Sequence, residues 1–459
     1  MFTNVKKYNI IVLKIKEDTI VLMGFKVKNF RSFKELQHFS MLSGKVRNNE
    51  NHIIEKNKHK ILKFSGMFGA NGSGKSNLIL AISIGQTLIS KGINTLINNQ
   101  YYRGVEDLKD KDSYFEYELA LNDKLYSYGF EINIYKREIV SEWLIDMTKT
   151  KEKIIFERDL KHNTYKSDIK DKKHSNFINC LDEMKRNTQN LFLSEMTRRL
   201  VMAMNNDIFF KDIFSVYKFM MQDTIIIRPS THKLFDIDYI KNKDKIIKIL
   251  KALDINIVDF VTETDNMENI RAKLSDNNYN NLLHDIDVLS MRYPNIKCTL
   301  RIENDLYTIK KQKDNNYDVC SLKFLHENNN NSFGAYDESD GTIRVLELID
   351  ILLTNDKLFL IDELDSSLHP LLVEGLLKIF LKSKTTNQLI ITTHELKTLD
   401  FDLIRRDEIW FAEKNQNGDS KIYSLEEFKD VARFDRKIDK AYLEGRFGAI
   451  ANIDTSYEN

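Results

Sequence analysis

The sequence predicts an α/β fold: a mostly parallel sheet with helices, interrupted by a large mixed α/β insertion. A glycine-rich loop at residues 69–76 follows an apolar segment and opens a helical one. From residue 324 onward, apolar strands alternate with helices, as a parallel sheet with helical crossovers requires. The apolar run 358–361 then ends in two acids. If the loop and the acids belong to one core, the long segment between them is an insertion into that core.

The core begins at an apolar/polar alternation, residues 24–33, which predicts a half-buried first strand. Residues 1–22 are therefore interpreted as an upstream extension. The N-terminal half of the core, with the glycine-rich loop, spans 23–140, an inserted lid or arm subdomain spans 141–320, and the C-terminal half spans 321–459.

The periodicity of the apolar residues predicts further strands and helices. Strand-like alternation recurs at 114–121 and 126–135, and helical periodicity is clearest at 181–204 and 245–253. No heptad pattern persists over three or four repeats, so a long coiled-coil arm is not expected.

Net charge, cysteine spacing and the length of the apolar runs limit the classes of protein to which the chain can belong. The 459 residues carry a formal net charge of +1, so no global field draws the protein to nucleic acid or to an anionic membrane. Cys180, Cys298 and Cys320 stand apart without CxxC spacing, which favours neither a disulfide framework nor a zinc site. No apolar run reaches the roughly 18 residues that span a bilayer. We expect a cytoplasmic protein that is not bound to a membrane.

The glycine-rich loop carries the strongest chemical signal. It matches GxxxxGK[ST] in full between an apolar segment and a helix, the context that a phosphate-binding loop needs. Backbone N–H groups would face phosphates, Lys75 would reach the terminal phosphates and Ser76 would ligate Mg²⁺. The alternative is a chance glycine turn. The predicted nucleotide-binding residues are Gly69, Ala70, Asn71, Gly72, Ser73, Gly74, Lys75, Ser76 and Asn77.

The apolar run 358–361 reads as a strand covered on both faces, and Asp362 and Glu363 follow it directly. A metal-nucleotide site explains two acids there: Asp362 would hold Mg²⁺ with Ser76, and Glu363 would activate the attacking water. The alternative is a strand that runs into an acidic turn. A second apolar strand, 388–393, ends in His394, which could hydrogen-bond the terminal phosphate or could be structural.

A small, hydroxyl-containing helix start forms a further candidate. Ser339, Asp340 and Gly341 precede an amphipathic helix with apolar residues from 345 to 352. The N-terminus of a helix is an anion site. A plain N-cap is the alternative that the sequence leaves open.

These motifs, taken in order, resemble an ABC-type ATPase of the SMC, RecF and OLD branch. Residues 69–76 resemble its Walker A motif, 339–341 its signature motif and 358–363 its Walker B motif. Asp365 resembles the D-loop aspartate and His394 the switch histidine. The segments 25–33, 338–342, 362–370, 405–410 and 442–450 are similar to bacterial ATPases of abortive-infection and anti-phage systems, close to the ATPase half of OLD nucleases.

The resemblance implies an ABC-type head with an antiparallel β subdomain, a head-to-head homodimer and ATP held between two heads. Ser339, Asp340 and Gly341 would act in trans, and Glu363 and His394 would be catalytic. It implies a sensor or scaffold that controls a toxin or nuclease partner, because only about 65 residues follow His394. Two features depart from the pattern: Asp340 replaces the usual glycine, and Gln100 is a weak glutamine-loop candidate.

Two other functions stay open at this point. A RecF-like ATPase would clamp DNA in repair or recombination, and a basic stripe would favour that reading. A nucleotide-gated module that does not hydrolyse ATP is the third, and the presence of both Glu363 and His394 argues against it.

Overall fold

The computed structural model describes residues 19–200, 208–228, 234–235, 242–292, 298–302, 305–312, 314–327, 331–428 and 438–450. These fall into two compact units. The core unit comprises the described parts of 18–228, 354–365 and 377–459. The inserted unit comprises those of 229–353 and 366–376. Most of the predicted upstream extension, residues 1–22, lies outside the described residues.

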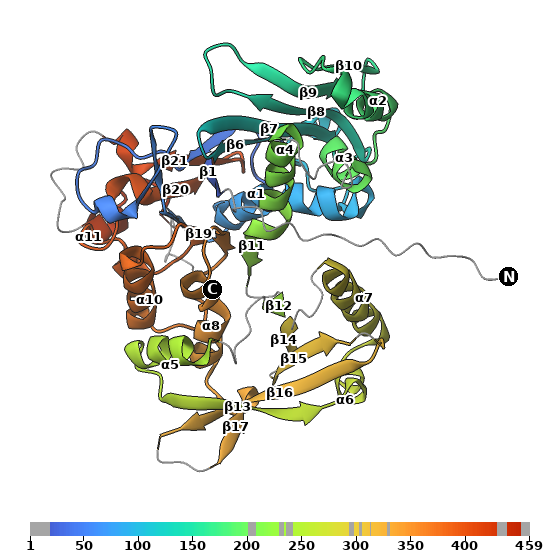
Figure 1. Cartoon of the computed structure of the whole chain (residues 1–459). Coiled ribbons are helices and arrows are strands. Elements are labelled where there is room, and N and C mark those ends of the chain that lie inside the picture. The colour runs from blue at the N-terminus through green and yellow to red at the C-terminus, as the bar shows by residue number, and fades with distance from the viewer. Residues whose placement is uncertain are drawn as a thin grey trace, which may run out of the picture. The chain divides into compact units, whose positions relative to one another are not determined.

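A mostly parallel sheet lies at the centre of the core unit (Figure 1). β11, β18, β19, β5 and β20 run parallel, and β21 closes the edge antiparallel to β20. β5, β18 and β19 are buried along their whole length, as strands covered on both faces are. In sheet order the strands are β11 (Thr224–Ile227), β18 (Leu358–Ile361), β19 (Gln388–Thr392), β5 (Phe64–Phe68), β20 (Ile409–Lys414) and β21 (Ser420–Ser424).

An antiparallel sheet forms the second layer of the core unit. In sheet order its strands are β10 (Thr164–Lys166), β9 (Lys153–Asp159), β8 (Glu138–Asp146), β7 (Lys124–Asn133), β6 (Ser113–Leu121), β1 (Ile20–Lys28) and β2 (Gln37–Ser40). A separate antiparallel hairpin is formed by β3 (Ile53–Lys56) and β4 (His59–Leu62). The predicted α/β class, the antiparallel β subdomain and the two strands at 114–135 are confirmed.

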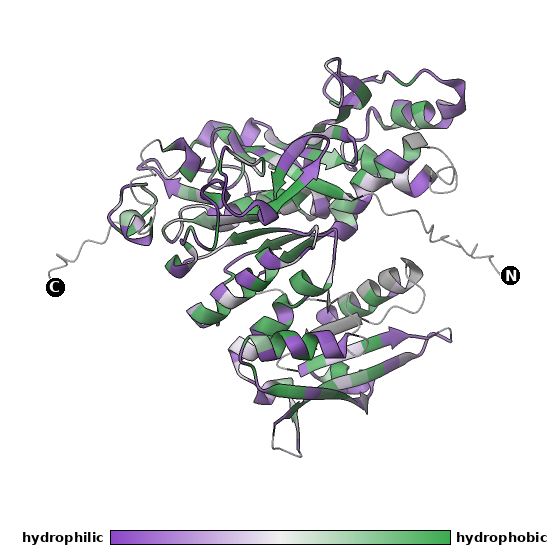
Figure 2. Ribbon diagram, turned by 60° about the vertical axis from the view of Figure 1, so that its left-hand side comes forward, coloured by the Kyte–Doolittle hydropathy of each residue, from purple (hydrophilic) through white to green (hydrophobic). Residues whose placement is uncertain are grey.

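Helices complete the core unit. Its described helices are α1 (Lys75–Lys91), α2 (Ser175–Met184), α3 (Phe192–Leu200), α4 (Ile208–Lys218) and α11 (Ile438–Leu443). Figure 2 shows the central strands mostly in the hydrophobic colour and the helices in both colours, the pattern of elements that bury one face. In the part of the chain that the structure describes, no helix is long and apolar enough to cross a membrane.

The inserted unit is built on an antiparallel sheet of its own. Its strands are β12 (Leu234–Phe235), β14 (Cys298–Ile302), β15 (Asp305–Lys311), β16 (Tyr317–His326) and β13 (Ile257–Asp265), with β17 (Ser332–Gly334) on β16. Its helices are α5 (Lys243–Ala252), α6 (Met267–Ala272), α7 (Asp276–Arg292), α8 (Asp340–Leu348) and α9 (Asp350–Leu353), and α10 (Pro370–Lys382) runs from this unit into the core unit.

The unit boundaries differ from the predicted ones. The insertion was placed at 141–320, but β8 and β9 extend the antiparallel sheet of the core, and the inserted unit begins at residue 229 and runs to 353. A fully buried pair, Arg158 with Glu142 at 2.7 Å, fixes this region. Arg158 donates to the carbonyls of Met184, the last residue of α2, and Asn190. Glu142 accepts from the backbone N–H groups of Phe192 and Leu193 at the start of α3.

The start of the core also differs. β1 begins at Ile20, so Ile20, Val21 and Leu22 belong to the first strand and pair with β6. All three side chains are buried. Their apolar run carries no alternation, because the early part of β1 is covered on both faces.

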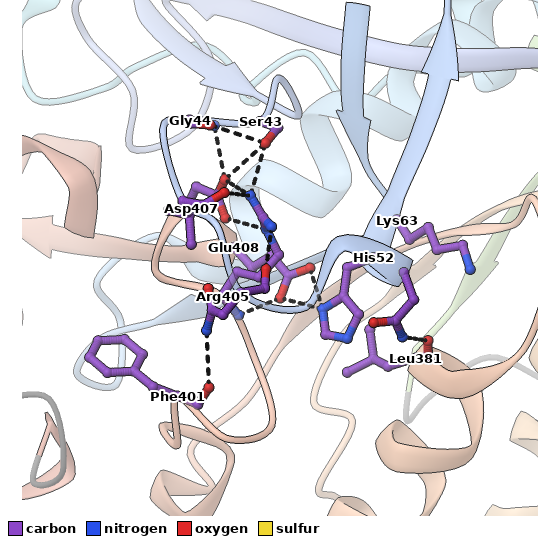
Figure 3. Close-up of polar contacts among 12 residues, drawn as sticks. Ser43, Gly44, His52, Lys63, Leu381, Phe401, Arg405, Asp407 and Glu408 are labelled. Atoms are coloured by element: carbon purple, nitrogen blue, oxygen red, sulfur yellow. Dashed lines mark hydrogen bonds and ion pairs between the residues drawn. The ribbon is translucent and has the colours of Figure 1, made fainter.

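A buried ionic cluster ties the loop at residues 43–52 to the segment that enters β20 (Figure 3). Arg405 donates to both carboxylate oxygens of Asp407, at 2.9 and 2.7 Å, and to the carbonyl of Asn48 at 2.6 Å. Beside it, His52 Nδ1 lies 3.0 Å from Glu408 Oε1. Burial raises the pKa of Glu408, while the contact with His52 opposes that shift.

Removing one partner of this cluster leaves a buried charge unpaired. We expect Asp407→Asn to lower the free energy of unfolding by about 3–5 kcal/mol, the usual cost of breaking a buried ion pair. The exposed Asp402→Asn is the matched control and should change it by less than about 0.5 kcal/mol. Urea unfolding of both variants measures the difference, and equal midpoints would show that the cluster adds nothing to stability.

Candidate nucleotide-binding site

The predicted phosphate loop joins the end of β5 to the start of α1, as the motif requires. Gly69, Gly72 and Gly74 adopt φ values of 150°, 74° and 113°, which side chains with a Cβ rarely adopt. A Cβ on Gly69 would lie 2.3 Å from the carbonyl of Ala412, and one on Gly74 would lie 2.6 Å from Ser420 Oγ. All three glycines are thus required by backbone conformation, and Gly69 and Gly74 are also required by space.

Hydrogen bonds hold the remaining residues of the loop in place. Ala70 N–H donates to the carbonyl of Ala449 at 2.9 Å, and Ser73 N–H donates to the carbonyl of Ala70 at 3.2 Å. Asn71 is exposed, and Ser73 is buried. On the first turn of α1, Asn77 Nδ2 donates to Ser32 Oγ at 2.7 Å. No sequence pattern predicted this contact.

Lys75 lies at the centre of the loop and is buried. Its Nζ donates to the carbonyls of Gly69 at 2.7 Å and Ala70 at 3.0 Å. Burial lowers the pKa of Lys75 to about 8, and the charges of Asp362, Asp365 and Glu363 oppose that shift. A triphosphate in the loop would supply the opposing charge that the buried ammonium lacks.

This lowered pKa predicts that ATP binding takes up a proton. A bound triphosphate favours the charged ammonium and raises its pKa, so ATP affinity should be constant well below pH 8 and should fall as the pH rises above it. At pH 8 roughly half a proton should be taken up for each Mg-ATP bound. Calorimetry in two buffers of different ionisation enthalpy measures it. Equal heats in both buffers and pH-independent affinity would contradict the prediction.

The acid pair follows β18 at the same edge of the sheet as the phosphate loop, because β18, β19 and β5 run parallel. Ser76 Oγ donates to Asp362 Oδ1 at 2.8 Å. Thr392 Oγ1, at the end of β19, donates to the same oxygen at 2.7 Å. The pairing of Ser76 with Asp362 is as the sequence predicted, whereas Thr392 was missed. Thr392 follows three apolar residues at the end of a predicted strand, and a hydroxyl at that position is the signal that could have identified this residue.

Ser76 and Asp362 fit a magnesium ion. They bring a hydroxyl and a carboxylate oxygen together, and Mg²⁺ is bound in such sites by one or two protein oxygens plus phosphates and water. Among the described residues, no group of three or more His, Cys, Asp or Glu side chains could hold a metal without such help.

Glu363 has an unusual backbone. Its φ is 51°, and its N–H donates to Thr392 Oγ1 at 2.8 Å. A left-handed conformation at a residue other than glycine is strained, and such strain is concentrated at functional sites. The side chain is exposed. Thr392 therefore contacts both acids: its hydroxyl donates to Asp362 and accepts from Glu363.

His394 follows β19 at this edge and is held through its backbone. Its N–H lies 3.2 Å from Asp365 Oδ1, so the structure brings the predicted switch histidine and D-loop aspartate together. Partial burial and the positive charge of Lys75 lower the pKa of His394. A lowered pKa favours the neutral ring, which has one N–H to donate.

The predicted signature residues belong to the inserted unit. Ser339 is the N-cap of α8: its Oγ accepts from Thr342 N–H at 3.1 Å, so the N-cap interpretation holds for this side chain. Ser339 and Asp340 are exposed at the helix start. A Cβ on Gly341 would lie 3.1 Å from the carbonyl of Ser367, which explains the small residue.

Gln100, the glutamine-loop candidate, has a structural contact: its backbone carbonyl accepts from the backbone N–H of Arg31 at 2.7 Å. It also borders a cavity of about 360 Å³. Ser32 and Asn77 line this cavity together with Tyr101 and Arg103, so the cavity adjoins the first turn of α1.

The chain resembles several solved structures and one protein family. No curated protein matches the chain. Solved structures that resemble it are the SMC head bound to the C-terminal winged-helix domain of ScpA (TM-score 0.40, 15% identity, 88% of this chain and 99% of the other), the SMC head domain from Thermotoga maritima (0.36, 13%, 88% and 98%) and the Pyrococcus furiosus SMC head bound to the C-terminal domain of ScpA (0.38, 13%, 90% and 99%).

One family model matches residues 64–400, which include the phosphate loop, the signature residues, the acid pair and His394. Its description is AAA domain, putative AbiEii toxin, type IV toxin–antitoxin system. The predicted relationship to ATPases of abortive-infection systems is thereby confirmed. Since the match covers well over half of the chain, the protein belongs to this family of AAA domains.

Proposed function

We propose that this protein binds and hydrolyses ATP. The observation that carries the proposal is the hydrogen-bonded series Ser76, Asp362, Thr392 and Glu363 beside the buried Lys75, all at one edge of the parallel sheet. A phosphate loop alone would support only nucleotide binding. The two acids, fixed by one hydroxyl, add the means to orient and deprotonate a water molecule.

Each residue then has a role in the reaction. The loop N–H groups and Lys75 hold the triphosphate, and the cavity beside Asn77 leaves room for the sugar and base. A magnesium ion on Ser76 and Asp362 would neutralise charge on the terminal phosphates. Glu363 accepts the proton of the attacking water, and the neutral His394 ring donates a hydrogen bond to the terminal phosphate.

The second part of the proposal is a head-to-head homodimer with ATP between the heads. Ser339 and Asp340 are exposed at the N-terminus of α8, where backbone N–H groups favour an anion. An ATP-binding head that also presents such a helix start can pair with a second copy by two-fold symmetry, which closes two identical sites. ATP would favour the closed dimer, and hydrolysis would open it.

The third part concerns the biological role. We propose that this ATPase acts in phage defence as a sensor or scaffold and that a separate toxin or nuclease is the effector. The family description, which names a toxin–antitoxin system, supports a role in defence. Co-purification with the product of the neighbouring gene, with and without ATP, tests this role. Turnover stimulated by duplex DNA and no effector bound would instead support the repair ATPase.

Ser339→Arg tests the composite site. A bulky cation at the exposed start of α8 should prevent closure over a second head, so ATP-dependent association and turnover should both be lost. Binding of ATP to one head should remain, because the phosphate loop is untouched. Light scattering and equilibrium dialysis measure the two properties. Unchanged turnover in this variant would mean that each head works alone.

A further inference from the structure

His326, the last residue of β16, contacts three separate segments of the inserted unit. Its Nδ1 lies 2.8 Å from the carbonyl oxygen of Asn256, which precedes β13. Its Nε2 lies 2.6 Å from Glu338 Oε1. Its ring packs edge-on against Phe333 of β17, with centroids 5.3 Å apart and planes at 78°. The three contacts join β17 and the residue before β13 to the residue that precedes Ser339.

Both ring nitrogens of His326 form hydrogen bonds. A carbonyl oxygen only accepts, so Nδ1 donates to Asn256. Nε2 and Glu338 Oε1 share the second hydrogen bond. The side chain of Glu338 is 6% exposed and that of His326 is 27% exposed.

The position of Ser339 depends on this bond, because Glu338 is its neighbour in the chain and the space beside it is open. A cavity of about 520 Å³ runs along the segment and is lined by His326, Glu338, Ser339, Leu253 and Leu371. Side-chain packing does not fill that space, so hydrogen bonds hold the segment. Besides the bond to His326, the N–H of Glu338 donates to the carbonyl of Ala335 at 3.3 Å. A shift of the sheet that carries His326 would pass to Ser339 through the bond between His326 and Glu338.

We propose that His326 is a positioning residue that fixes Ser339 for the composite ATP site and couples the inserted sheet to that site. The inference rests on the proposed function, since it needs Ser339 to act on ATP in trans. It adds a route by which a partner bound to the inserted sheet would alter ATP turnover without touching the nucleotide.

The test compares two substitutions in the full-length chain. His326→Phe keeps a ring against Phe333 and removes both hydrogen bonds, and His326→Gln retains an N–H donor toward Glu338. We expect kcat for ATP to fall roughly 10- to 100-fold in His326→Phe, as for a misplaced reacting group, with KM and single-head ATP affinity unchanged. His326→Gln should recover most of the loss.

The matched control is His162→Phe. His162 also forms a 2.6 Å contact with a carboxylate, that of Asp159, but this pair is exposed and belongs to the core unit. It should leave kcat unchanged. Thermal unfolding of each variant separates misplacement from loss of folding. If His326→Phe does not fold, Glu338→Ala and His326→Ala are compared with their double variant, whose loss should not exceed the larger single loss.

The outcomes separate this inference from the proposed function. A parent protein that does not hydrolyse ATP contradicts the proposed function. A parent that hydrolyses ATP, with His326→Phe equally active or with KM and kcat impaired together, overturns the role of His326. Losses that multiply in the double variant would also overturn it.

Discussion

Glu363→Gln is expected to slow ATP hydrolysis by roughly 10²- to 10⁴-fold, the usual contribution of a positioned general base, while ATP binding survives. The amide keeps the size of the carboxylate but cannot accept a proton. The backbone N–H that donates to Thr392 is unchanged, so Asp362 keeps its position. Loss of a negative charge beside the triphosphate also eases its approach.

The consequence of this change is a trapped state. Since ATP is bound and not consumed, the variant should accumulate an ATP-dependent dimer, or show tighter partner binding if heads are already paired. Size exclusion with Mg-ATP measures it, and the exposed Glu138→Gln is the control. Hydrolysis at the parent rate in Glu363→Gln would exclude Glu363 as the base.

Lys75→Ala is expected to abolish measurable ATP binding. The ammonium is buried and lies within 3.0 Å of two loop carbonyls, so its removal leaves those carbonyls facing the phosphates without a cation between them. The loop N–H groups would not compensate for its loss. Lys91→Ala, an exposed lysine at the other end of α1, is the matched control and should bind ATP as the parent does. Undiminished ATP affinity of Lys75→Ala in calorimetry would show that ATP binds elsewhere.

Local sequence patterns were sufficient to predict the phosphate loop and the acid pair. The loop lies where the motif, the apolar strand and the helical run meet, and parallel strands bring their carboxyl ends to one edge. The contact between Ser76 and Asp362 follows from that rule although the two residues are far apart in the chain.

Sequence patterns could not predict the contacts between residues that lie far apart in the chain. Glu142 and Arg158 read as exposed charges in a local pattern, but they form a buried pair that ties β8 and β9 to the helices α2 and α3. This is why the predicted boundary at residue 141 fell inside a sheet of the core. Thr392 and the carbonyl of Ala449 support the site through tertiary contacts that no spacing rule encodes.

We propose that one ATP is hydrolysed by residues of two chains, and a mixture of two inactive variants shows whether this is so. Lys75→Ala keeps Ser339 but cannot hold ATP in its phosphate loop. Ser339→Ala keeps the loop but has lost the hydroxyl that acts in trans, and, unlike Ser339→Arg, it adds no bulk that would block closure of a mixed dimer. Each alone should be inactive. In an equal mixture, half of the dimers carry one intact composite site, so roughly a quarter of the parent ATPase rate should return. A mixture that hydrolyses no more ATP than the two variants measured separately would contradict the composite site.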